Sequence, residues 1–304
     1  MHLGQVTVRY RAGDWDECEQ LAGAIPELVT TLTVAALAIH GLPVQIARGR
    51  SVAAKRLRQL AAFTGVDPVF DTEVALYEAE LATWQGHLDR ARSAIQRALA
   101  SADAIEHPSE AAIVAWVCIK GLTAEAERAE GARAAGDAAA LTDAIAVGHE
   151  LLERARAAAE RAKQTADAHN VYVVGHLAKA EAEWTRLQGR SDPKAWQAAI
   201  DAFSFGHVYA VARCRWRLAE ALLRGHSGTS IRVTVHAPRR YREAGCSPAA
   251  RRPAWRRRRT AQSPGRSGSA AADTPPARRS SVLPSSDGGP AAATTRSHSG
   301  RCGP

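Results

Sequence analysis

The sequence is short of the residues that build disulfide-rich, metal-binding or strand-rich proteins. Only five cysteines occur among its 304 residues, and no Cys-x-x-Cys pair is present. Their odd number and wide spacing argue against a disulfide framework or a zinc site and fit a reducing compartment. Aromatic residues make up 5% of the chain. Because the alternation typical of strands is also nearly absent from residues 1–224, we expect helices there.

The chain also lacks the apolar segments that direct a protein to a membrane or anchor it there. Its first residues lead into polar sequence without the basic stretch and apolar core of a signal peptide. The longest apolar run, residues 28–39, has 12 residues and includes three threonines. It is too short to span a bilayer and fits a buried helix. We therefore expect a cytoplasmic protein with no membrane partner.

Motifs that carry catalytic or cofactor chemistry are missing as well. The sequence contains neither a glycine-rich phosphate loop nor a Gly-x-Ser-x-Gly nucleophile elbow. After His149 and Glu150, the place of the second histidine of a zinc protease is taken by Glu153. His169 and His176 would lie about 10 Å apart along a helix, too far to share one metal easily. We predict no enzymatic activity, no cofactor, and no catalytic or metal-binding residue.

Charge is distributed very unevenly along the chain. The chain has 40 basic and 31 acidic residues, which gives a net charge of +9. Residues 225–304 hold 15 arginines and three acidic residues, a net charge of +12, so residues 1–224 carry −3. A basic balance that would point to a nucleic-acid or membrane-surface partner therefore belongs to the C-terminal segment alone.

Residues 225–304 also differ from the rest in composition. They contain nine of the 14 prolines and only seven large apolar residues. Such a segment cannot bury enough apolar surface to offset its chain entropy, so we expect a disordered tail rich in Arg, Pro, Ser and Gly. A GC-rich gene read in a shifted frame yields the same composition, and Leu283 is the only leucine here. Three interpretations stay open: an out-of-frame product, a natural tail, and a nucleic-acid-binding segment.

Residues 1–224 are rich in alanine, leucine, arginine and glutamate, which are good helix formers. Gly13, Gly49 and Gly86 recur at spacings of 36 and 37 residues, and glycine readily ends a helix in a tight turn. A small residue that allows close helix approach stands five positions after each glycine: Cys18, Ala54 and Ala91. The period predicts an all-α domain of stacked antiparallel hairpins, an α-solenoid of tetratricopeptide type, over residues 1–224.

Later in the chain the predicted helices become longer. Further turns are expected at Gly136 and Gly189, with helices over residues 110–134 and 137–168. Within the second of these, two intrahelical ion pairs are expected at a spacing of four residues: Glu150–Arg154 and Arg156–Glu160. In the last helix one side is predicted to pack: Val208, Val211, Ala212, Leu218, Ala219 and Leu222. Arg213 and Arg217 fall on its other side.

Four tryptophans are the candidate site residues of this sequence. They lie on helical stripes or beside turns: Trp84, Trp184, Trp196 and Trp216. Large aromatics in such places knit neighbouring helices together, whereas the same residue type anchors peptides in grooves. We favour packing and keep a role in a groove as the alternative.

Two stretches near the end of the helical region carry a resemblance to a known family. Residues 192–203, DPKAWQAAIDAF, and residues 209–223, YAVARCRWRLAEALL, resemble the late helical repeats of large actinobacterial LuxR-type transcriptional regulators. Such regulators combine an ATPase module, a long tetratricopeptide-like region and a C-terminal helix-turn-helix domain. The resemblance spans residues 5–224. It implies a non-enzymatic module that receives a protein or small-molecule effector and relays that signal to the other domains.

The chain departs from this family pattern at both ends. No ATPase module precedes the repeats, and residues 225–304 show neither a Thr-x-Arg-Glu start nor a recognition helix. We therefore expect a truncated regulator that makes no contact with DNA itself, because that contact belongs to the missing helix-turn-helix domain. The alternative is a stand-alone basic protein that binds nucleic acid through its arginine-rich tail.

Overall fold

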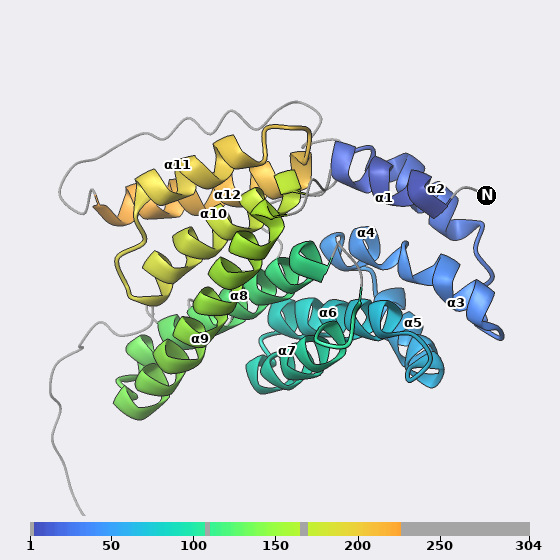
Figure 1. Cartoon of the computed structure of the whole chain (residues 1–304), viewed down its shortest axis with the longest axis horizontal. Coiled ribbons are helices and arrows are strands. Elements are labelled where there is room, and N and C mark those ends of the chain that lie inside the picture. The colour runs from blue at the N-terminus through green and yellow to red at the C-terminus, as the bar shows by residue number, and fades with distance from the viewer. Residues whose placement is uncertain (1–2, 107–109, 165–169, 226–304) are drawn as a thin grey trace, which may run out of the picture. The chain divides into compact units, whose positions relative to one another are not determined.

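A computed structural model describes residues 3–106, 110–164 and 170–225 of the chain (Figure 1). All regular structure within these ranges is helical, which confirms the predicted all-α class for the described residues. The helices are α1 (Leu3–Ala12), α2 (Trp15–Gly23), α3 (Leu32–Ile39), α4 (Leu42–Ala47), α5 (Val52–Leu60), η1 (Ala61–Phe63), α6 (Pro68–Gln85), α7 (Leu88–Ala102), α8 (Glu110–Ala135), α9 (Ala138–Lys163), α10 (Asn170–Leu187), α11 (Pro193–Ala202) and α12 (Val208–Gly225). The expected disordered tail lies, apart from residue 225, outside the described residues.

The turns within the hairpins follow the glycine spacing of the sequence. Positive φ angles, between 67° and 87°, occur at all five expected turn glycines: Gly13, Gly49, Gly86, Gly136 and Gly189. Gly86 shows the reason, because in its left-handed conformation (φ 79°) its N–H bonds to the carbonyl of Thr83 at 3.1 Å and closes the end of α6. Each glycine separates two helices of one hairpin, from α1/α2 to α10/α11. The predicted turn positions are therefore confirmed.

Several of these helices begin at an aspartate that caps the exposed backbone N–H groups. Asp67 accepts a hydrogen bond from the N–H of Phe70 at 2.8 Å, and Asp137 accepts one from Ala140 at 2.9 Å. Asp192 caps α11 in the same way. Such caps fix where a helix starts and each contributes on the order of 1 kcal/mol.

Consecutive helices pack against one another from α6 to α12, and the first helices of neighbouring hairpins also touch. Thus α8 contacts both α6 and α10 as well as its own partner α9 (Figure 1). The shared core is rich in alanine, with Ala94, Ala126 and Ala155 fully buried between neighbouring helices. Small side chains let these helices approach closely, which explains why an alanine-rich sequence forms a continuous core.

One contact departs from a simple stack of neighbouring hairpins. Helix α1 packs against α12, close to the other end of the described helices. Tyr209 lies 5.4 Å from Tyr10 and 5.2 Å from Trp15, measured between ring centroids. The Arg11 guanidinium lies 4.4 Å above the ring of Tyr172 in α10. A solenoid in which each repeat contacts only its neighbours does not contain this contact.

Two details of register differ from the sequence prediction. At the start of α5, Ala53 is the fully buried small residue, whereas the expected Ala54 is only half-buried. In α12 the buried stripe is Ala210, Cys214, Arg217 and Ala221. The predicted packing side of α12 was only partly right: Val211 and Leu218 pack against the core, whereas Val208 and Leu222 are exposed and Arg217 faces the interior.

A close helix approach at Gly175 gives a testable prediction. A β-carbon there would lie 2.6 Å from the ring of Phe203, which is itself buried. Gly175→Ala should lower the free energy of unfolding by about 1–3 kcal/mol, because the rigid ring must move. Gly131 is an exposed residue of α8, and a β-carbon there would meet no atom within 4 Å. Gly131→Ala should therefore raise the free energy of unfolding by about 0.5–1 kcal/mol. Urea unfolding of both variants tests this, and shifts of the same sign would contradict it.

Candidate functional site

The main polar feature is a surface shared by the first helices of successive hairpins and by α12. On α6, α8 and α10 its side chains recur at spacings of three to four residues, which places them on one face of each helix. We call this set the inner surface: Glu73, Tyr77, Glu80 and Trp84 of α6; Lys120, Thr123, Glu127 and Glu130 of α8; His176, Lys179, Glu183 and Arg186 of α10; and His207, Arg213, Arg217 and Arg224 at or in α12. Helices that are far apart in the sequence thus contribute to one surface.

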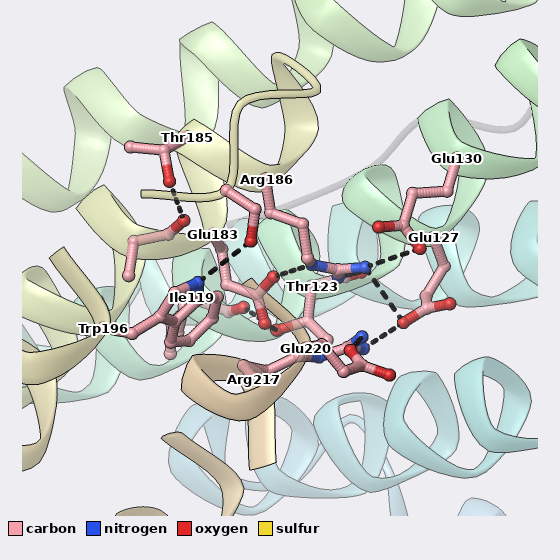
Figure 2. A network of polar contacts seen from close by, with 12 residues as sticks. Ile119, Thr123, Glu127, Glu130, Glu183, Thr185, Arg186, Trp196, Arg217 and Glu220 are labelled. Carbon is pink, nitrogen blue, oxygen red and sulfur yellow. Dashed lines mark hydrogen bonds and ion pairs between the residues drawn. The ribbon is translucent and has the colours of Figure 1, made fainter. Parts of the chain in front are cut away.

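A buried ion-pair network joins α8 to α10 within this surface (Figure 2). Arg186 and Glu183 are each 1% exposed, and the Arg186 Nε donates to Glu183 Oε2 at 2.6 Å. Arg186 Nη1 lies 3.2 Å from Glu127 Oε1 and 3.4 Å from Glu130 Oε2. Its Nη2 donates to the Thr123 carbonyl oxygen at 3.2 Å. Every nitrogen of the buried guanidinium therefore has an acceptor, which offsets the cost of removing its charge from water.

The same network extends to α12. Arg217 is buried and donates to Glu220 Oε2 at 2.8 Å and, through Nη2, to Glu127. Arg224 reaches Glu130 at 2.7 Å. Burial alone would raise the pKa of Glu127, but the Arg186 and Arg217 guanidinium groups lower that pKa to about 2. Because the main packing partner of α12 is α11, these side chains carry its connection to α8.

The other half of the inner surface is rich in positive charge. We define the inner basic cluster as Arg11, Lys120, Lys179 and Arg213. Lys120 forms an ion pair with Glu80 at 2.7 Å. Lys179 makes no hydrogen bond or ion pair with any described residue, and the buried Nη1 of Arg213 donates no hydrogen bond. Three of the four cations therefore lack a carboxylate partner in the described part of the chain.

The titration of neighbouring groups reflects this concentration of positive charge. Burial lowers the pKa of Lys179 to about 8, and the nearby Arg213 and Lys120 add to that shift, while Cys214 and Glu183 oppose it. Burial, reinforced by Arg11, Lys179 and Lys120, lowers the pKa of His207 to about 3. Burial also lowers the pKa of His176 well below its usual range, and the same three cations add to that shift. Both histidines are therefore neutral at neutral pH, and the cluster lies close enough together to act on shared groups.

The carboxyl groups around the inner basic cluster do little to balance it. Glu80 forms an ion pair with Lys120, and Glu183 forms one with Arg186. Glu73 has no ion pair, and burial raises its pKa to about 7, although Arg11 opposes the shift. Glu73 is therefore only partly ionised at neutral pH, and the region keeps an excess of positive charge.

The four candidate tryptophans fall into two groups. Trp196 is fully buried in the core between α10, α11 and α12, and half-buried Trp184 packs against the main core. Trp84 and Trp216 are 45% and 41% exposed. The Arg213 guanidinium lies 4.3 Å from the Trp84 ring centroid and 5.2 Å from that of Trp216. The first pair fits the packing interpretation, whereas the second pair borders the inner basic cluster.

A pocket lies between the end of α7, the start of α8, and α9. This pocket has a volume of about 410 Å³ and is lined by Asp103, Ile105, Glu110, Val114, Arg154, Ala157 and Arg161. Arg154 is paired with Asp103, and Arg161 lies 2.9 Å from Glu110. Both arginines are thus used to join helices. The expected Glu150–Arg154 pair is replaced by this interhelical contact.

Cysteine and histidine side chains form no reactive or metal-binding group in the described ranges. Cys18, Cys118 and Cys214 are fully buried, and burial raises their pKa values to about 11, 12 and 11. No cluster of three His, Cys, Asp or Glu residues that could hold a metal ion occurs among the described residues. His169 lies outside them.

The fold defines this protein as an all-α array of packed helical hairpins. Among the helices described by the structure, none is both long and apolar enough for a membrane span. No family model, curated protein or solved structure matches the chain.

The inner basic cluster was not found by sequence reasoning. Lys179 and Arg213 look like ordinary surface charges of amphipathic helices, and Arg11 precedes a turn 168 positions earlier than Lys179. The available signal was the unusual position of Arg213 and Arg217 next to Trp216 in a short cationic and aromatic stretch. It could not indicate which helices would face them.

Proposed function

We propose that this chain is a helical-repeat module of a LuxR-type transcriptional regulator that works in the cytoplasm by binding a protein or small-molecule effector. Its role is binding and relay rather than catalysis. The resemblance of residues 192–203 and 209–223 to the late repeats of that family supports the proposal. In the structure these residues form α11 and most of α12, and α12 contributes side chains to the inner surface.

The observation that carries the proposal is the inner surface itself. Its side chains come from α6, α8, α10 and α12, and Arg11 of α1 adjoins it. One molecule bound there would contact helices from both ends of the described chain. Binding that favours one arrangement of these helices over another is the physical basis of a relay. The ion pairs from Arg217 and Arg224 to α8 give α12 a side-chain connection that such binding can strengthen or weaken.

A thermal-unfolding screen of the full chain tests this proposal. The chain is heated in the presence of small molecules grouped by charge, and a bound effector should raise the midpoint of unfolding, because it stabilises only the folded state. At a ligand concentration of 100 times the dissociation constant the gain is about 2.7 kcal/mol. Failure of every charge class to shift the midpoint would count against a small-molecule effector. Coexpression with the ATPase and helix-turn-helix portions of a LuxR-type regulator then tests for a protein partner.

The nucleic-acid alternative makes a different prediction. The 15 arginines of residues 225–304 would give duplex DNA binding whose affinity falls steeply with salt concentration. Replacing those arginines with glutamine in the full chain would abolish that binding. Steep salt dependence together with no effector response would favour this alternative over the regulator module.

A further inference from the structure

We propose that the inner basic cluster binds a small organic or inorganic anion with two or more negative charges, such as a di- or tricarboxylate or a phosphate monoester. This inference rests on the proposed function and specifies the chemical class of its effector. Arg11, Lys179 and Arg213 would supply the charges that hold the anion, and Lys120 would add to the field around it.

Arg11, Lys179 and Arg213 form no ion pair with any described residue. Lys179 and Arg213 are half-buried, yet neither forms an ion pair with a described carboxylate. The Arg213 guanidinium lies 4.3 Å from the Trp84 ring centroid and 5.2 Å from that of Trp216, and its buried Nη1 has no acceptor among the described residues. Holding a cation in such a place is costly unless an acceptor is supplied. An anion would supply one and would use the planar donor geometry of the guanidinium.

The carboxylates near the cluster already form ion pairs with other cations. Glu80 pairs with Lys120 at 2.7 Å. Glu183 accepts from Arg186, and Glu127 accepts from both Arg186 and Arg217. Moving Glu80 toward Lys179 would leave Lys120 without its ion pair, and moving Glu183 or Glu127 would take a carboxylate away from the buried Arg186. The positive charge of the cluster is therefore available to a molecule from solution rather than to the chain itself.

The partial burial of the cluster favours a small ligand. Arg11, Lys120, Lys179 and Arg213 are all half-buried, and they come from α1, α8, α10 and α12. Side chains that are enclosed by several helices and yet reachable by solvent suit a small molecule. The backbone of duplex DNA or a flat protein surface needs exposed cations, which this cluster does not offer. A charge of two or more follows from the three cations that lack carboxylate partners.

The test uses the full chain with citrate, succinate and inorganic phosphate as probes, and with succinamide as an uncharged analogue of succinate. Binding is measured by calorimetry and by the shift in unfolding midpoint at constant ionic strength, because salt screens such interactions. At least one anion should bind, and succinamide should not. The carboxylate and phosphate arms identify which anion class fits the cluster.

Three variants locate the binding. Lys179→Gln and Arg213→Gln should each weaken anion affinity by on the order of tenfold or more, because each removes a charged donor. Arg215→Gln removes the same charge from an exposed position of the same helix and should leave affinity unchanged. Without ligand, Lys179→Gln should unfold at or above the wild-type midpoint, since it removes an unpaired cation. This last measurement separates lost binding from lost folding.

Two results would overturn the inference. One is that no multivalent anion binds the wild-type chain. The other is that Arg215→Gln weakens binding as much as Lys179→Gln does, which would indicate general charge attraction. If uncharged or cationic effectors bind instead, and Lys179→Gln and Arg213→Gln leave their affinity unchanged, then only the anion assignment fails and the proposed function still holds. If no effector or protein partner binds, the proposed function fails as well.

Discussion

Replacing Arg186 with alanine is expected to lower the free energy of unfolding by about 3–5 kcal/mol, the loss typical of a broken buried ion pair. The guanidinium is 1% exposed and contacts Glu183, Glu127 and Glu130. Its removal leaves the buried Glu183 without its ion-pair partner, whereas Glu127 and Glu130 keep Arg217 and Arg224. Urea unfolding followed by circular dichroism measures the loss.

Arg156→Ala is the matched control for this prediction. Arg156 also contacts two glutamates, Glu153 and Glu181 at 2.7 Å each, but all three side chains are well exposed. Surface pairs of this kind contribute less than about 1 kcal/mol. Equal losses for the two arginine variants would show that burial does not govern the strength of the network.

The pH dependence of the Arg186→Ala effect gives a further check. The pKa of Glu127 is depressed to about 2 in the folded chain, against an ordinary unfolded value of about 4.3. A depressed carboxyl pKa contributes stability above the unfolded value, and that contribution is lost as the pH falls toward 2. The difference between wild type and variant should therefore narrow below about pH 4. A difference that stays constant down to pH 2 would rule out the charge network as its cause.

Replacing Trp196 with alanine is expected to cost about 3–5 kcal/mol, the usual effect of emptying a large core position. Trp196 is fully buried beside Ile200 and Phe203, and its indole N–H lies 3.3 Å from the Ser191 hydroxyl. The substitution would leave a cavity that the short helix α11 cannot fill by moving. Thermal and urea unfolding should both show the loss.

Trp84→Ala serves as the matched control, because the same side chain is removed from a place that is 45% exposed. It loses the contact with Arg213, worth about 0.5–1 kcal/mol at an exposed site, and little buried area. A loss as large as that of Trp196→Ala would mean that Trp84 supports the fold rather than the edge of the inner surface.

Local features of this fold could be predicted because they depend on a few neighbouring residues. Helix content follows from alanine-rich amphipathic patterns. The turns at Gly86 and Gly136 follow from the low cost of a left-handed conformation at glycine. The helix predicted over residues 110–134 matches α8 (Glu110–Ala135) for the same reason. In each case the information lies within one or two helical turns of the chain.

The partners of the ion pairs could not be predicted from the spacing of charges in the sequence. The four-residue spacing of Arg156 and Glu160 predicted an intrahelical pair, yet Arg156 contacts Glu153 and Glu181 instead. A spacing rule describes an isolated helix, whereas in the folded chain a neighbouring helix offers further carboxylates. The choice among those partners depends on how the helices pack, which the spacing does not contain.

The sequence by itself determined that the described part of residues 1–224 is mainly helical and where five of its turns lie. Only the tertiary structure decided what each helix faces. It placed Arg217 on the buried side of α12, brought α1 against α12, and gathered Lys179 and Arg213 on one inner surface. The physical reason is that helical periodicity specifies a face of a helix but not the neighbour that covers it. A buried cation and a solvated one therefore look alike in the sequence until the partner helices are in place.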